Sequence, residues 1–362
     1  MYTLLAATSS IHWVDYLIVV ASILLAVVMG FYFAHRQKDS NAYFTASGRV
    51  PDWAIGMSIF ATLISSVTFL AYPGAAYAGN WILLVQGLMV PIVLVSLIGL
   101  IVPLFRKVIK LSTYEYFERR FGAFARFYSS IAFVLTHFTK MGSVFFLVSM
   151  ALAQFMNLDI YWVIAVLGVT IILLTFLGGM EAIIWMDVIQ GGMLIGGGLI
   201  CIVLLLFAIG TPFSAGDILQ TAWNATTNVG PYEVSKIGIG PFEWDLVETT
   251  FLVMVLNGFF YALQKYGTDQ TIVQRYLTAK DDKSAKKAAF IGVFLSVPIW
   301  TIFMFVGSLL FAYYQLSPDA AIEGMKADAV FPHFISTQLP IGVRGLIIAA
   351  IAAAAISSLD SD

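Results

Sequence analysis

The middle of the second apolar segment reads Ala61-Thr62-Leu63-Ile64-Ser65-Ser66-Val67-Thr68, with Gly56 before it and Pro73-Gly74 after it. Hydroxyl groups at this depth in a membrane need partners, and backbone that leaves the helix there is tolerated only where it lines a cavity. The pattern therefore favours a helix that unwinds and offers its carbonyl oxygens to a cation. The hydroxyls could instead bond back to the preceding turn or join neighbouring helices. This stretch alone leaves both interpretations open.

The composition places this stretch in a membrane protein. Apolar residues make up 60% of the chain, charged residues make up 11%, and the mean hydropathy is +0.90, whereas soluble domains contain roughly 25% charged residues. Nine apolar segments are candidate spans; they are 13–33, 53–72, 82–104, 127–156, 161–177, 183–209, 246–263, 288–313 and 341–359. Most of them approach or exceed the ~20 residues that cross a bilayer, whereas the fifth and the seventh are shorter. We therefore predict an all-α polytopic membrane protein, with the lipid bilayer as a partner and no binding of nucleic acid.

The basic residues are sorted between the loops. Of 19 lysines and arginines, all but four lie in the loops 34–52, 105–126 and 264–287; the exceptions are Lys140, Lys236, Lys326 and Arg344. Basic loops of membrane proteins face the cytoplasm. The N-terminus is therefore expected outside, and the protein is expected in the plasma membrane, in particular the bacterial inner membrane.

A lysine interrupts the fourth apolar segment. Lys140 lies near its middle, with His137 three residues before it and Ser143 three residues after it, all on one helical face. A lysine at the bilayer centre costs ~2.5–3.5 kcal/mol or more. It could pair with a buried acid such as Asp187 or Glu248, or it could bind an anionic group of a substrate. We favour the substrate, because charges inside a membrane usually mark functional sites.

Two later segments carry further polar signals. The pair Asn257-Gly258 predicts a second helix break, and paired breaks five segments apart are typical of inverted-repeat transporters, although a channel could also use them. In the last segment Ala354, Ser357 and Ser358 share one helical face. With an unwound second segment, their oxygens could bind sodium; alone, they would be interpreted as a small-residue packing face.

Several motifs resemble those of the sodium:solute symporter family, which includes sodium/glucose, proline, pantothenate and sialic acid transporters. The motifs are Asp15-Tyr16, Tyr43-Phe44, Ser47-Gly48-Arg49, residues 113–122, Gly267-Thr268-Asp269-Gln270 and Val273-Gln274-Arg275. The resemblance implies one transporter domain (1–362) with a LeuT-type inverted-repeat core. Its parts would be an extra first helix (13–33), a five-helix repeat (53–209) and an incomplete second repeat (246–362). Since family members continue for several helices, the chain is expected to be truncated.

The resemblance also implies binding sites. Sodium, the expected coupling ion, would be bound by the backbone oxygens of Ala61, Ile64 and Ala354 and the hydroxyls of Ser357 and Ser358. A second cation site would involve Asp187 and Ser361, with Asp360 at a position where serine or threonine is usual, so the sodium stoichiometry stays open. The substrate pocket would contain Ser65, Thr68, Gln86, Lys140, Asn257 and Tyr261.

The implied function is sodium-coupled symport of a small organic solute by alternating access. Sialic acid transporters of the family are similar in the pocket region, with an arginine where this chain has Lys140, so we expect an anionic sugar such as sialic acid, or another carboxylate. A neutral-sugar symporter is the first alternative, and a membrane sensor that binds sodium and ligand without transport is the second. An enzyme is not expected, because the four histidines are scattered and no nucleophile–base pattern occurs. The oligomeric state is not predicted.

Overall fold

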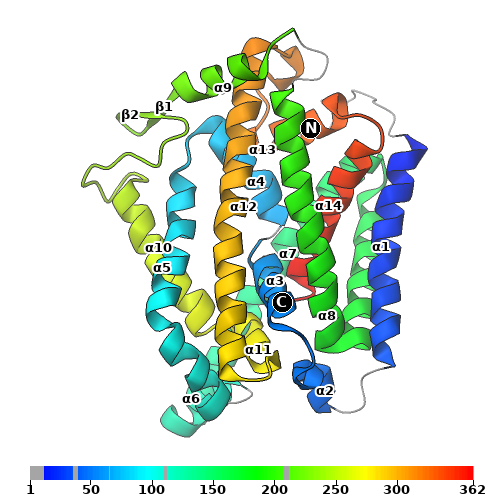
Figure 1. The fold of residues 1–362 in the computed structure, drawn as a ribbon, viewed down its shortest axis with the longest axis vertical. Coiled ribbons are helices and arrows are strands. Elements are labelled where there is room, and N and C mark those ends of the chain that lie inside the picture. Colours follow the sequence, from blue (N-terminus) through cyan, green and yellow to red (C-terminus); the bar gives the residue numbers. More distant parts are fainter. Residues whose placement is uncertain (1–11, 36–39, 65, 110–111, 208–211, 362) are drawn as a thin grey trace.

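The computed structural model describes residues 12–35, 40–64, 66–109, 112–207 and 212–361, and most of these residues are helical (Figure 1). The helices are α1 (Trp13–Ala34), α2 (Ser40–Thr45), α3 (Asp52–Leu63), α4 (Ser66–Ala78), α5 (Ile82–Pro103), α6 (Thr113–Phe121), α7 (Ala123–Met156), α8 (Ile160–Leu206), α9 (Ala215–Asn224), α10 (Phe251–Gly267), α11 (Gln270–Thr278), α12 (Asp282–Leu316), α13 (Ala327–Gln338) and α14 (Val343–Leu359). One hairpin joins the strands β1 (Thr226–Val229) and β2 (Tyr232–Ser235). The predicted all-α membrane class is confirmed.

Among the described residues, five helices are long and apolar enough to cross a membrane, and there are six such spans if the bent pair α3 and α4 is counted as one span. The helix α8 contains two of the predicted segments. A straight helix of its 47 residues would measure roughly 70 Å, more than twice the thickness of the bilayer core. Gly179 breaks it with φ 61° and ψ −166°, a backbone conformation that glycine adopts readily. The two halves meet at the lower end of α8 in Figure 1.

The second segment is interrupted, in agreement with one of the two interpretations of its hydroxyls. The helix α3 ends at Leu63, α4 begins at Ser66, and the two are bent by 54°. Both rest on the continuous helix α12, where small residues allow close approach. A Cβ atom on Gly56 of α3 would lie 2.7 Å from Ile291, and one on Gly307 would lie 2.3 Å from the carbonyl oxygen of Pro73 in α4. One straight helix therefore supports both halves of the broken one.

The predicted break at Asn257-Gly258 is wrong, because α10 runs through this pair without interruption. Gly258 is explained by packing instead: a Cβ atom there would lie 2.8 Å from both the Gln86 carbonyl oxygen and Met89 Cβ of α5. The helix ends at Gly267, and Thr268 and Asp269 separate it from α11. This break lies beyond the predicted segment 246–263, in the adjoining basic loop.

The first helix holds the last one in place. Asp15 of α1 is buried, and its Oδ1 accepts hydrogen bonds from the backbone N–H groups of Gly342 (2.7 Å) and Gly345 (2.9 Å). These N–H groups lie at the N-terminus of α14, so the carboxylate on the neighbouring helix α1 caps α14. The dipole of α14 favours negative charge at this end. The next residue, Tyr16, donates its hydroxyl to the carbonyl oxygen of Met156 at the end of α7.

The loops divide between the two ends of the helical bundle. The helices α2, α6 and α11, which belong to the arginine- and lysine-rich loops, gather at the lower end in Figure 1, and we call this the basic end. The helix α9, the hairpin and α13 lie at the opposite end. The sorting of charge in the sequence is thus reproduced as a sorting in space. The side of the membrane that each end faces stays a prediction.

Candidate functional site

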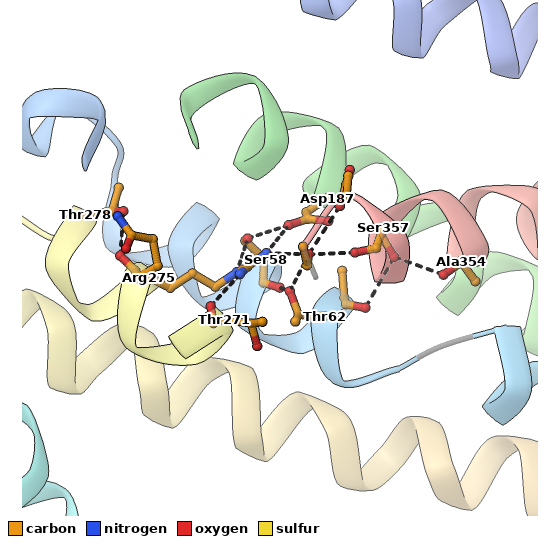
Figure 2. Close-up of polar contacts among 12 residues, drawn as sticks. Ser58, Thr62, Asp187, Thr271, Arg275, Thr278, Ala354 and Ser357 are labelled. Carbon is orange, nitrogen blue, oxygen red and sulfur yellow. Dashed lines mark hydrogen bonds and ion pairs between the residues drawn. The ribbon is translucent and has the colours of Figure 1, made fainter. Parts of the chain in front are cut away.

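The break between α3 and α4 meets the end of α14. Ser357 Oγ lies 3.3 Å from the carbonyl oxygen of Ala61 and 3.2 Å from that of Ala354, and Ser358 Oγ lies 3.1 Å from the latter (Figure 2). Ile64 follows α3 with extended backbone (φ −97°, ψ 104°), so its carbonyl group has left the helical direction. All five residues are buried. The structure therefore brings the predicted carbonyls and hydroxyls to one place, and neutral oxygens of this kind suit a sodium ion.

A buried arginine lies beside this cluster. Arg275 of α11 is 1% exposed, and its Nη2 contacts both Asp187 Oδ2 (3.1 Å) and Ser361 Oγ (2.8 Å). Its Nε donates to Ser58 Oγ (2.7 Å), which in turn donates to Asp187 Oδ2 (2.5 Å) (Figure 2). The network thus joins α3, α8, α11 and α14. Sequence reasoning missed this role, because an arginine in a basic loop is ordinarily solvated.

The second predicted cation site coincides with this network. Asp187 uses Oδ2 for Ser58 and Arg275, whereas its Oδ1 is buried without a hydrogen-bond partner among the described residues. Ser361 Oγ donates to the carbonyl oxygen of Ser357 at 2.7 Å and lies 3.2 Å from Oδ1 of the largely buried Asp360. Asp187, Asp360 and Ser361 therefore belong to one connected cluster. Arg275 is a cation that already lies within it.

A cavity of about 300 Å³ lies next to the break. Four of the predicted substrate residues line it: Thr68, Gln86, Lys140 and Tyr261. They come from α4, α5, α7 and α10. Asn257 lies one turn before Tyr261 but is exposed and outside the lining. Ser65 lies outside the described residues.

The cavity wall also contains residues that the sequence analysis did not assign to the substrate pocket. His137, Lys265 and Asp269 are largely buried and line it. Trp300 of α12 forms another part of the wall and packs against Gly87, where a Cβ atom would lie 2.4 Å from the indole ring. His137 was noted only as sharing a helical face with Lys140, and Lys265 and Asp269 were assigned to a basic loop, because only the fold brings these residues to one cavity.

The two acids considered as partners of Lys140 lie elsewhere. Asp187 forms its ion pair with Arg275, and Glu248 packs against Gly230 in the turn of the hairpin. Lys140 instead belongs to the wall of the cavity, together with Gln86 and Tyr261. A lysine, a glutamine and a tyrosine supply a cation and several hydrogen-bonding groups. This set could bind a polar molecule with a negative charge.

Comparisons with known proteins identify the family of the chain. The family model described as Sodium:solute symporter family matches residues 43–362. The sodium/sialic acid symporter NanT of Aliivibrio fischeri is 35% identical over 347 residues, which cover 96% of this chain and 67% of that protein. The sodium/sialic acid symporter SiaT of Proteus mirabilis is 33% identical over 349 residues, covering 96% and 68%. The substrate-bound, outward-open structure of a Na+-coupled sialic acid symporter matches with a TM-score of 0.89 at 33% identity, covering 97% of this chain and 72% of that one.

Proposed function

Because the chain belongs to the sodium:solute symporter family, we propose that it imports sialic acid, or a similar sugar acid, together with sodium ions by alternating access. The observation that carries this proposal is the position of Lys140, which shares one cavity with Thr68, Gln86 and Tyr261 beside the broken helix. A cation in this wall favours a carboxylate over a neutral hexose. The relatives NanT and SiaT, both named as sialic acid symporters, support the same substrate class.

Sodium would act through the broken helix. Ala61 lies in the last turn of α3 and Ile64 directly follows that helix, and the nearby residues Thr62, Leu63 and Thr68 line the cavity. A sodium ion that bridges the break to Ser357 and Ser358 of α14 would therefore also fix one wall of the substrate pocket. This shared wall would couple the binding of sodium to the binding of the substrate, because each of them stabilises the arrangement of the wall to which the other one binds.

The number of sodium ions decides whether transport moves charge. A sugar acid carries one negative charge, so one sodium ion would make the cycle electroneutral, whereas a second ion at Asp187, Asp360 and Ser361 would make it electrogenic. Each net charge moved inward gains ~2.3 kcal/mol per 100 mV of membrane potential. Asp187 Oδ1, which has no hydrogen-bond partner among the described residues, offers an oxygen to the second ion.

We place the basic end in the cytoplasm, the N-terminus outside and the protein in the plasma membrane. The sorting of lysines and arginines supports this orientation. The bacterial origin of NanT and SiaT supports the bacterial inner membrane. A labelling experiment with single cysteines in the loops 34–52 and 212–214 would test the orientation, because only the latter should react from outside intact cells.

The experiment that tests the function is uptake of labelled sialic acid by proteoliposomes that contain the full-length protein. We expect an inward sodium gradient to drive accumulation, and we expect a neutral hexose to compete poorly. Binding of sialic acid without accumulation would identify a sensor, and accumulation of the neutral hexose alone would identify a sugar symporter. Either result would reject the proposal.

A further inference from the structure

A second lysine lies in the wall of the same cavity, on the side toward the basic end of the helical bundle. Lys265 is only 7% exposed and lines the cavity together with Gln264 and Asp269. Its Nζ donates to Asp269 Oδ2 at 2.7 Å and lies 3.4 Å from Thr271 Oγ1. The cavity thus has one lysine on α7, Lys140, and another at the end of α10.

The ion pair of Lys265 spans the break between α10 and α11. Asp269 caps α11: its Oδ1 accepts hydrogen bonds from Thr271 N–H (2.9 Å) and Thr271 Oγ1 (2.6 Å). Its other oxygen, Oδ2, bonds to Lys265 on α10 and lies 3.7 Å from His137 Nε2 on α7. One carboxylate therefore joins three helices at the point where the cavity approaches the basic end.

We propose that Lys265 and Asp269 form the floor of the substrate cavity, and that Lys265 is a second carboxylate-binding group that takes over the substrate during release toward the basic end. This inference rests on the proposed function, because it assumes an anionic substrate. In the described arrangement Asp269 compensates the charge of Lys265, so Lys265 is not available to an incoming carboxylate. When α10 and α11 separate, the ammonium group of Lys265 becomes available to the substrate.

The energetic reason lies in the cost of opening the floor. Separating a buried ion pair leaves two charges without their partner, which is strongly unfavourable. A substrate carboxylate can replace Asp269 as the partner of Lys265, whereas an empty cavity or a neutral sugar cannot. Opening should therefore be easier with an anion bound. This exchange would also reduce the leak of sodium in the absence of substrate.

A purely structural ion pair would connect the same helices, so the test must separate the two roles. The full-length protein in proteoliposomes is compared with Lys265→Gln, Lys265→Arg and the double variant Lys265→Gln/Asp269→Asn. The double variant removes both charges. It therefore leaves no unpaired carboxylate buried at position 269, but it does not restore a cation at position 265. Lys107→Gln is the matched control, because Lys107 lies 3.3 Å from Asp282 in an exposed ion pair at the basic end, away from the cavity.

The readouts are equilibrium binding of labelled sialic acid and the maximal rate of sodium-driven uptake. For Lys265→Gln we expect Kd within about threefold of the parent but a maximal rate lowered at least about tenfold, the pattern of a group that acts after binding. Lys265→Arg should recover most of the rate, the double variant should stay slow, and Lys107→Gln should resemble the parent.

Three results would overturn the inference: an unchanged rate in Lys265→Gln, equal losses of binding and rate, or recovery of the rate in the double variant. The last result would mean that Lys265 only neutralises Asp269. Uptake by the parent protein tests the proposed function separately. Failure of the parent to transport sialic acid would reject that function. Differences in Kd and maximal rate between the variants and a transporting parent test only the role of Lys265.

Discussion

Between α3 and α4 the chain leaves the helix with the carbonyl groups of Ala61 and Ile64 beside the serines of α14, whereas between α10 and α11 it does so with Lys265 bound to Asp269. Both breaks border one cavity, the first through Thr62 and Thr68 and the second through Lys265 and Asp269. Neutral oxygens can bind a monovalent cation without a large charge of their own. An ion pair can instead open and exchange its partner. The comparison suggests that one break binds the coupling ion and the other controls the anionic solute.

The largest effect is expected at Arg275, whose ion pair with Asp187 stabilises the surroundings of the first break. Arg275→Ala would leave a buried carboxylate without its cation, which typically costs ~3–5 kcal/mol. We therefore expect a large drop in the midpoint of thermal unfolding in detergent and loss of transport. Lys107→Ala, which removes an exposed cation at the same end, is the control and should change the midpoint little.

If Arg275→Ala unfolded no earlier than that control, the first break would not depend on its buried ion pair. The proposed contrast between the first break and a second break that opens would then be lost.

A smaller but specific effect is expected at Lys140. Lys140→Ala removes the cation of the cavity wall, and hydrogen bonds to charged groups contribute ~1.5–3 kcal/mol, or about 10- to 100-fold in affinity. Calorimetric titration should show that loss for sialic acid and little change for sodium. Loss of sodium affinity by a similar factor would mean that Lys140 supports the structure of the first break.

The smallest effect concerns the far end of α4. Lys236 Nζ donates to the carbonyl oxygens of Tyr77 (2.8 Å) and Gly79 (3.1 Å), and it lies 4.3 Å from the centre of the Phe311 ring. Burial lowers the pKa of Lys236 from 10.5 to about 8. At a pH between these two pKa values, the unfolded chain binds more protons than the folded protein. The free energy of unfolding should therefore rise with pH.

The measurement is the midpoint of thermal unfolding between pH 7 and pH 10 in the parent and in Lys236→Gln. We expect the parent to gain more stability than the variant over this range. Equal slopes would show that Lys236 does not couple the far end of α4 to pH, and the second half of the broken helix would then be held by packing alone.

The two breaks also differ in how far sequence could predict them. The first was found because Ser65, Ser66 and Thr68 stand out in an apolar run, and the bend of 54° between α3 and α4 confirms it. The second was placed at Asn257-Gly258, where the glycine serves helix packing. The true break carries Lys265 and Asp269, which a sequence pattern cannot distinguish from solvated loop residues.

The same limit applies to the polar network around the cation cluster. The positions of Ser357 and Ser358 on one helical face were visible in the sequence, because helical periodicity is local. The pairing of Arg275 with Asp187 joins residues 88 positions apart, and no local pattern indicates it. The turn at Gly179 was foreseen only as a gap between two apolar segments.

The account depends on sodium at the first break shaping the cavity. The most direct test measures sialic acid affinity by titration with and without sodium in the full-length parent, in Ser357→Ala and in Ser296→Ala. The last variant removes a buried hydroxyl of α12 that donates to the Gly292 carbonyl oxygen of the same helix, and it leaves every proposed sodium ligand in place. We predict that sodium raises the affinity of the parent and of Ser296→Ala, and that Ser357→Ala loses most of this increase, with the reciprocal loss in sodium affinity. An equal sodium effect in Ser357→Ala and the parent would contradict the account.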